Sequence, residues 1–394
     1  MKDSPRGLAA AALYRVNQEG AYSNLVLDSL LSSHELAARD KGLVSALFYG
    51  CLERKITLDY IIASYSKTAL NQIEPFVLEL LRIGLYQLLY MDKIPHAAAV
   101  NESVALAKKS GHGQAAGYVN GVLRAVERNL GKLVFPPEKN RLTYLSIRYA
   151  CPKWLIKLWD REYGKQLCEE MLPCLLGRPP LTVRSNPLAC RLEELSDSLS
   201  REGIQTKEIS WLPDSLEIGS TGGIENTEPY QKGWFHVQDL SSQLCCFLLG
   251  ARPGERVLDV CAAPGGKTFT LAEMMENQGE LLSFDLHEQR VRLIQEGASR
   301  LGLRNVRAAQ RDALEESVDF QADRILCDVP CSGFGILRRK PEIRQKDPHI
   351  LDNLPELQYR ILYRSSQMLR PGGILFYSTC TLNPSENERV VSRF

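Results

Sequence analysis

The feature that most constrains the fold of this chain is an alternation, after residue 254, of short apolar runs with longer segments. These segments are long enough to form helices, and a chain that alternates in this way folds into a parallel sheet with helices packed on it. We therefore predict an α/β domain with a doubly wound, mostly parallel sheet. Its strands are expected near residues 256–260, 280–285, 305–309, 323–328 and 373–378.

A turn rich in alanine and glycine follows the first predicted strand. It lacks the Gly-x-Gly-x-x-Gly spacing of a dinucleotide site, and Gly265 lies too close to Lys267 for a P-loop. Glycines here let the backbone approach a ligand closely, at the sheet edge where such folds bind cofactors. We therefore predict that a cofactor lies against the turn residues Cys261, Ala262, Ala263, Pro264, Gly265, Gly266 and Lys267.

Acidic residues end or follow the next two predicted strands. Asp285 ends the second strand, where a carboxylate can hold two ribose hydroxyls; the alternative is that it caps the helix expected over 288–301. Asp312 follows the third strand, where an acceptor can bind an adenine amino group. Together with Arg290, on the helix after Asp285, these residues complete the predicted cofactor site.

Two cysteines follow the last two predicted strands. Cys331 lies in the segment Asp-Val-Pro-Cys-Ser-Gly (328–333), and Cys380 lies in Ser-Thr-Cys-Thr (378–381). In a doubly wound sheet the fourth strand lies beside the first and the fifth beside the fourth, with neighbours about 4.8 Å apart. Both thiols can therefore face one pocket beside the cofactor.

Two such thiols beside a nucleotide cofactor suggest methyl transfer to C5 of a pyrimidine. This carbon is a poor nucleophile, but addition of a thiolate to C6 turns the ring into an enamine that can attack a methyl sulfonium. One cysteine is essential for this route, and a second can help as a base or in release. Asp328 could hydrogen-bond to the N3/N4 edge of cytosine, and Lys267 could orient the base or favour a thiolate.

The remaining cysteines and the histidines show no ligand pattern. The 11 cysteines contain no Cys-x-x-Cys pair and the six histidines complete no zinc pattern, so we predict no metal. There is no signal peptide at the start and no apolar run of membrane-spanning length, which indicates a reduced, cytoplasmic, soluble protein without a membrane partner. Cys261 has no assigned chemistry. Small buried apolar roles are expected for Cys51, Cys168, Cys174, Cys190, Cys245, Cys246 and Cys327.

The balance of charge gives no reason to expect a nucleic acid partner, because 48 Lys and Arg residues face 47 Asp and Glu residues. A polyanion would therefore have to be bound by a local patch. The sharpest basic patch directly follows the Cys331 motif, and this position favours contacts with RNA phosphates over the alternative of a solvated loop. Its residues are Arg338, Arg339, Lys340 and Arg344.

The rest of the chain divides into three further segments. The N-terminal segment is expected to be all-helical, beginning with Ser4 as a cap and Pro5 as the first helical residue, with Gly20 ending the first helix. The predicted domains are a helical domain over 1–130, a linker over 131–141, a small α/β module over 142–235 and the parallel-sheet domain over 236–394.

The N-terminal segment resembles the NusB family, a helical RNA-binding fold used in antitermination. The resemblance covers roughly the first third of the chain. It rests on Ile94-Pro95-His96 and on the segments over residues 100–109 and 119–124.

Almost the whole chain resembles the RsmB (Sun/Fmu) family of RNA cytosine-C5 methyltransferases. The resemblance implies a Rossmann-like class I methyltransferase domain, S-adenosylmethionine as cofactor and 16S ribosomal RNA of the small subunit as partner. It further implies that Cys380 is the nucleophile, that Cys331 assists product release and that Asp285 and Asp312 bind the cofactor. The matching segments are residues 233–239, 264–268, 328–335, 338–344 and 378–388.

Two alternatives remain open: the same chemistry on another RNA such as tRNA, and a non-catalytic RNA-binding or antitermination factor. The NusB-like segment favours rRNA over tRNA. Retention of both thiols, Lys267 and Asp328 argues against a non-catalytic factor. The final strands of the family would follow Phe394, so the sheet is expected to be truncated at its C-terminal end; we also expect a monomer.

Overall fold

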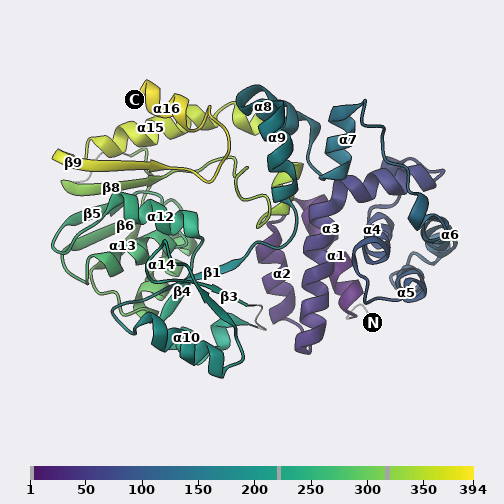
Figure 1. The fold of residues 1–394 in the computed structure, drawn as a ribbon, viewed down its shortest axis with the longest axis horizontal. Coiled ribbons are helices and arrows are strands. Elements are labelled where there is room, and N and C mark those ends of the chain that lie inside the picture. Colours follow the sequence, from purple (N-terminus) through teal and green to yellow (C-terminus); the bar gives the residue numbers. More distant parts are fainter. Residues whose placement is uncertain (1–3, 220–222, 316–319) are drawn as a thin grey trace. The chain divides into compact units, whose positions relative to one another are not determined.

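The computed structural model describes residues 4–219, 223–315 and 320–394, and within them the chain forms two compact units (Figure 1). The helical unit comprises the described residues up to Arg178 together with Ile336–Pro348. The α/β unit comprises Pro179–Gly335 and His349–Phe394. Within the helical unit, the helices over 141–171 pack with the N-terminal helices.

The helical unit begins as its sequence predicts. The Ser4 side chain accepts a hydrogen bond from the Gly7 N–H group at 3.2 Å, and Gly20 ends the first helix with a left-handed φ of 68°. The helices of this unit are α1 (Pro5–Glu19), α2 (Ser23–Ser32), α3 (Ala38–Tyr65), α4 (Pro75–Tyr90), α5 (His96–Lys109), α6 (Ala116–Glu127), α7 (Arg141–Arg148), α8 (Lys153–Tyr163), α9 (Lys165–Met171) and the 3-10 helix η6 (Pro341–Gln345).

One apolar cluster joins α1 to α6 and includes Leu47, Leu81 and Leu85. The cluster surrounds a charged group that the sequence did not predict. Arg82 is buried, with ion pairs to Asp59 and Glu79, each at 2.6 Å. Since a buried charge is tolerated only when it is paired, these contacts explain how an arginine fits into the most apolar helix of the unit.

The α/β unit starts with an antiparallel sheet of four strands in the order β2-β3-β1-β4. The elements of this part are β1 (Leu181–Ser185), α10 (Leu192–Arg201), β2 (Thr206–Glu208), β3 (Ser215–Ile218), α11 (Glu228–Gln231) and β4 (Phe235–Val237).

A parallel sheet of five strands follows, in the order β7-β6-β5-β8-β9. The prediction that the fourth strand lies beside the first and the fifth beside the fourth is confirmed. The elements of this part are α12 (Leu240–Leu249), β5 (Arg256–Asp259), α13 (Gly266–Met274), β6 (Glu280–Asp285), α14 (Glu288–Arg300), β7 (Val306–Gln310), β8 (Ala322–Asp328), α15 (Leu354–Ser366), β9 (Leu369–Ser378) and α16 (Glu388–Arg393).

Helices cover both faces of the parallel sheet. Side chains alternate along a strand, so Val257 of β5 packs in one apolar cluster with residues of α12, α13 and α14, whereas its neighbour Leu258 packs in another with residues of α15. Figure 1 shows α13 and α15 on opposite sides of the sheet. Because both faces are covered, the carboxyl ends of the strands are the natural place for a ligand.

Candidate active site

A cavity of about 200 Å³ lies at the carboxyl end of β5. It is formed by the predicted cofactor turn, by Asp328 at the end of β8 and by residues at the junction of β4 and α12. Its lining residues are Val237, Gln238, Asp239, Ser242, Asp259, Cys261, Ala262, Ala263, Pro264, Gly266, Lys267 and Asp328.

Gly265 has a structural role in the turn. Its φ of 110° favours glycine, and a Cβ there would lie 2.4 Å from Cζ of Phe269. Phe269 is a residue of α13 that is buried in a core cluster of the parallel-sheet domain. The glycine is therefore required for the turn and for core packing, and it is not among the residues that line the cavity.

Lys267 and Asp328 form an ion pair on the cavity wall. The Nζ atom of Lys267 lies 2.7 Å from Oδ2 of Asp328, and the Ser378 hydroxyl donates to Oδ1 at 2.8 Å. Burial lowers the pKa of Lys267, but the charge and hydrogen bond of Asp328 outweigh burial and raise this pKa above its usual value. Lys267 is therefore a fixed cation that orients Asp328.

The two predicted thiols lie next to each other. The Sγ atoms of Cys331 and Cys380 are 3.1 Å apart, and the Cys380 N–H group donates to Sγ of Cys331 at 3.3 Å. Cys380 is exposed and Cys331 is half-buried. The hydrogen bond with Cys380, followed by burial, raises the pKa of Cys331 far above its usual value.

A buried glutamate that the sequence analysis did not single out holds the loops of the two thiols together. Glu386 accepts hydrogen bonds from the Ser332 N–H group at 2.8 Å, from the Ser332 hydroxyl at 2.6 Å and from the Asn383 amide at 2.9 Å. Ser332 follows Cys331, and Asn383 lies three residues after Cys380. Glu386 lies in a segment that carried the family resemblance, which was the one available signal for it.

Comparison with known proteins identifies the family. The 16S rRNA methyltransferase RsmB/F profile matches residues 246–394, the NusB profile matches residues 3–128 and the RsmF/B-like ferredoxin-like domain profile matches residues 151–225. The probable ribosomal RNA small subunit methyltransferase B of Bacillus subtilis (strain 168) is 40% identical, over 100% of this chain and 88% of its own length. The chain belongs to this methyltransferase family.

Solved structures show the same fold. PH0851 superposes with a TM-score of 0.84 at 24% identity, covering 100% of this chain and 90% of its own. A methyltransferase homologue from Pyrococcus horikoshii superposes with a TM-score of 0.57 at 30% identity, covering 64% of this chain and 80% of its own. The predicted family and fold class are thus confirmed.

S-adenosylmethionine is the cofactor of this methyltransferase family, and the cavity suits its charged groups. Asp259, at the end of β5, is buried, and its Oδ2 atom accepts a hydrogen bond from Thr268 at 2.8 Å. Burial raises the pKa of Asp259 to about 7, so a cationic group beside it would stabilise its charged form. Asp259 was not predicted as a site residue, although it ends its strand as Asp285 and Asp328 end theirs.

Two of the other predicted cofactor ligands of this methyltransferase, Asp285 and Arg290, contact the turn. Asp285 accepts hydrogen bonds from the N–H groups of Ala263 at 3.3 Å and His287 at 3.1 Å, and Arg290 donates to the Ala263 carbonyl at 2.8 Å. The cap of α14 is His287, so Asp285 does not cap that helix. Asp312 follows β7 and accepts from the Leu314 N–H group at 2.9 Å. Their contacts with cofactor stay predictions.

The residues of the basic patch belong to the helical unit, but they differ in burial and in hydrogen bonding. Arg344 is buried and donates to the carbonyls of Leu337 at 2.8 Å and Leu175 at 2.7 Å. Its guanidinium is used inside the protein, so a phosphate contact by Arg344 is not supported. Arg338 donates to the Arg178 carbonyl at 2.7 Å, whereas Lys340 is exposed.

The other cysteines follow their predicted roles with two exceptions. Cys174 is exposed and Cys245 is half-buried, so neither is the buried apolar residue that was expected. Cys261 lines the cavity, and burial raises its pKa well above the usual value, so it stays protonated. In the described ranges there is no cluster of His, Cys, Asp and Glu that could hold a metal ion. None of the described helices is long and apolar enough to cross a membrane.

Proposed function

We propose that this methyltransferase transfers a methyl group from S-adenosylmethionine to C5 of a cytosine in 16S ribosomal RNA, through a covalent bond between Cys380 and C6. The relative from Bacillus subtilis is described as acting on small-subunit ribosomal RNA, which supports this substrate. The observation that carries the chemistry is the thiol pair, 3.1 Å apart, in the loops that follow Asp328 and Ser378.

The two thiols differ in a way that divides their roles. Cys380 is exposed, so its sulfur can reach C6 of a base turned out of the RNA. Cys331 keeps its proton at neutral pH because its pKa is raised by the hydrogen bond with Cys380 and by burial. We assign Cys380 as the nucleophile and Cys331 as the group that assists elimination after methyl transfer. In this step the C5 proton leaves to water, the C5=C6 bond re-forms and the Cys380–C6 bond breaks, and the Cys331 thiol can protonate the departing sulfur.

Asp328 and Lys267 position the base in this proposal. Asp328 is held by Lys267 and by the Ser378 hydroxyl, so its carboxylate has a defined direction. A carboxylate held in this way can accept a hydrogen bond from the N4 amino group of cytosine. S-adenosylmethionine, when bound, supplies the electrophilic methyl group.

RNA selection is assigned to the helical unit. Its NusB-like part and the exposed Lys340, with Arg338 and Arg339, are proposed to contact the RNA. Deleting residues 1–130 would not test this cleanly, because η6 packs on α3 within the same compact unit. Substitution of the three basic residues is the better test, and each lost phosphate contact should reduce the log–log salt dependence of binding by about 0.7.

The proposal is tested with Cys380→Ala. Methyl transfer to a 16S rRNA fragment and the covalent RNA adduct should both disappear, with thermal unfolding unchanged because the side chain is exposed. Radiolabelled methyl transfer and a denaturing gel measure the two quantities. An adduct that persists in Cys380→Ala would assign the nucleophile to another thiol.

The RNA substrate is tested separately. Bisulfite sequencing of rRNA and tRNA, from cells with and without the gene, should show the lost 5-methylcytosine in 16S rRNA. A loss of 5-methylcytosine in tRNA alone would support the same chemistry with tRNA as the substrate. No loss in either, with S-adenosylmethionine still bound by the protein, would favour the non-catalytic RNA-binding factor.

A further inference from the structure

One buried donor in the cofactor cavity has no hydrogen-bond partner among the residues that the structure describes. Gln238 directly follows β4, lines the cavity and is only 5% exposed. Its Nε2 atom makes no hydrogen bond within the described ranges. A buried N–H group without a partner costs about 1–3 kcal/mol, so its presence in a ligand cavity points to a ligand acceptor.

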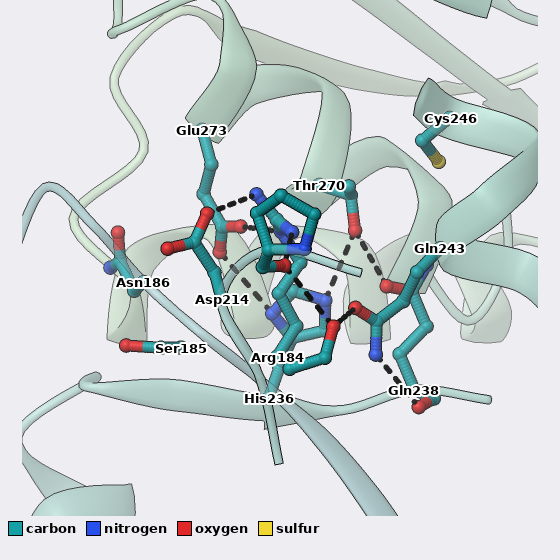
Figure 2. A network of polar contacts seen from close by, with 12 residues as sticks. Arg184, Ser185, Asn186, Asp214, His236, Gln238, Gln243, Cys246, Thr270 and Glu273 are labelled. Atoms are coloured by element: carbon teal, nitrogen blue, oxygen red, sulfur yellow. Dashed lines mark hydrogen bonds and ion pairs between the residues drawn. The ribbon is translucent and has the colours of Figure 1, made fainter. Parts of the chain in front are cut away.

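The orientation of the Gln238 amide follows from a short contact on its other side. The Oγ1 atom of Thr270 lies 2.6 Å from Oε1 of Gln238. This distance is typical of an O–H···O bond and is short for an N–H···O bond. Thr270 therefore donates to the amide oxygen, which turns the amide nitrogen away from Thr270 (Figure 2).

Thr270 is itself held by a network of buried charges. Figure 2 shows His236 between Thr270 and Glu273: its Nε2 atom lies 3.4 Å from Oγ1 of Thr270, and its Nδ1 atom lies 3.3 Å from Oε1 of Glu273. The Nε atom of Arg184 donates to Oε2 of Glu273 at 2.8 Å. Arg184 of β1 and His236 of β4 thus contact Glu273 and Thr270 of helix α13. The first residues of this helix line the cavity.

The place of the free amide indicates which ligand group it meets. Gln238 packs on Gly266, the first residue of α13, where a Cβ would lie 3.8 Å from Nε2 of Gln238. The N–H groups of a first helical turn have no partner inside the helix, and together with the helix dipole they favour an anion. Nearby Lys267 is already paired with Asp328. The one anionic group of S-adenosylmethionine is its carboxylate.

We propose that Gln238 is a further cofactor-binding residue whose Nε2–H group donates to the carboxylate of S-adenosylmethionine. Thr270, His236, Glu273 and Arg184 are positioning residues that fix the direction of this amide. The inference rests on S-adenosylmethionine being bound in this cavity. It gives the antiparallel sheet a part in cofactor binding, because Gln238 directly follows β4, and Arg184 and His236 belong to β1 and β4.

The proposal is tested by calorimetry on the full chain with two ligands, S-adenosylmethionine and its analogue that lacks the carboxylate. Gln238→Met removes the amide at nearly constant volume and should weaken binding of S-adenosylmethionine about tenfold or more. Its affinity for the decarboxylated analogue should stay within about twofold of wild type. An equal loss for both ligands, or no loss for S-adenosylmethionine, would overturn the assignment.

Gln243→Met is the matched control. Gln243 is another buried glutamine, which accepts from Ser215 at 2.6 Å and donates to the backbone carbonyl of Gln238 at 3.2 Å. Neither of these hydrogen bonds involves the Gln238 side-chain amide or a residue that orients it, and Gln243 does not line the cavity. Its loss should leave the affinity for S-adenosylmethionine within about twofold. A tenfold loss in the control as well would show that loss of a buried amide outside the cavity also weakens binding, and would overturn a direct contact by Gln238.

Thr270 provides a second variant pair if Gln238→Met does not fold. Thr270→Val removes the hydroxyl that orients Gln238. Binding of S-adenosylmethionine should then weaken about threefold, because the Gln238 side chain would have to be ordered when the ligand binds. Thr270→Ser should restore the affinity. Failure of the serine variant to restore it would overturn the orienting role. Wild-type protein that binds no S-adenosylmethionine would instead contradict the proposed function itself.

Discussion

Two regions of the α/β unit are built from reactive or charged side chains, but they differ in exposure. The thiol edge, Asp328 with Cys331 and Cys380, lies at the ends of β8 and β9 and includes an exposed sulfur. The buried network, Arg184, His236, Gln238, Thr270 and Glu273, is almost fully covered. Groups of the thiol edge are open to a substrate, whereas most groups of the buried network are satisfied by each other.

This difference predicts two kinds of defect. A change of either thiol should remove chemistry and leave the fold intact, because the Cys380 side chain is exposed and the Cys331 sulfur bonds with it. A change in the buried network should lower stability as well as ligand binding, because it leaves a polar group unpaired in the interior. The following predictions test the division, beginning with the largest expected effect.

Cys331→Ala tests the thiol edge most severely. Turnover should fall at least about a hundredfold, the usual scale for loss of a proton-transfer group, while the covalent protein–RNA adduct accumulates because elimination is blocked. A denaturing gel detects the adduct as a slow band. Loss of activity without an adduct would mean that Cys331 is needed before C6 is attacked.

Asp259→Asn tests a residue that is buried like the network but lines the cavity. The pKa of Asp259 is about 7 in the folded protein and near 3.8 when unfolded, so the native state holds the proton between these values. Asp259 therefore contributes to the unfolding free energy of the wild-type protein at low pH. This contribution, up to about 4 kcal/mol, is lost as the pH rises from about 4 to 7.

The Asn variant does not titrate at this position. Its unfolding free energy relative to wild type should therefore rise through the same pH window and level off above about pH 7. Urea unfolding of both proteins at several pH values measures this difference. A difference that is constant with pH would show that the folded and unfolded states ionise Asp259 alike.

Glu273→Gln tests the buried network. Arg184 would lose its buried carboxylate partner, and the unfolding free energy should fall by about 3 kcal/mol. Glu194→Gln is the control, because Glu194 pairs with Arg191 on the surface and the amide can keep the helix cap. Urea unfolding should show no measurable change for the control. Equal losses of unfolding free energy in the two variants would show that the buried and the exposed charge contribute alike to stability.

Asp285→Asn has the smallest expected effect, a loss of about tenfold in affinity for S-adenosylmethionine if the carboxylate holds the ribose. Arg290→Met is the matched variant, since Arg290 contacts the same turn at Ala263 and pairs with Asp285. Calorimetry should show a smaller loss for Arg290→Met. Equal losses would mean that Asp285 acts by shaping the turn.

The thiol edge was largely predictable from the sequence because it is local. Cys331 and Cys380 follow apolar strands, and the order of strands in a doubly wound sheet brings their ends together. The strands near residues 256, 280, 306, 322 and 373 were predictable for the same reason, because the alternation of short apolar runs with longer segments is a local property of the sequence. Caps such as Ser4 and Gly20 depend only on a few neighbouring residues.

The buried network was not predictable, because its members come from β1, β4 and α13 and have no spacing in common. The same is true of Arg344, whose surroundings in the sequence indicate a basic patch but whose side chain is buried against the Leu175 carbonyl. Whether a charged side chain faces water, a ligand or another buried charge depends on the residues that pack around it. The sequence by itself determined the fold class, the cofactor turn and the two thiols, since these follow from local patterns and strand order. Only the tertiary structure decided which polar groups are satisfied inside the protein and that the Nε2 group of Gln238 is left for a ligand.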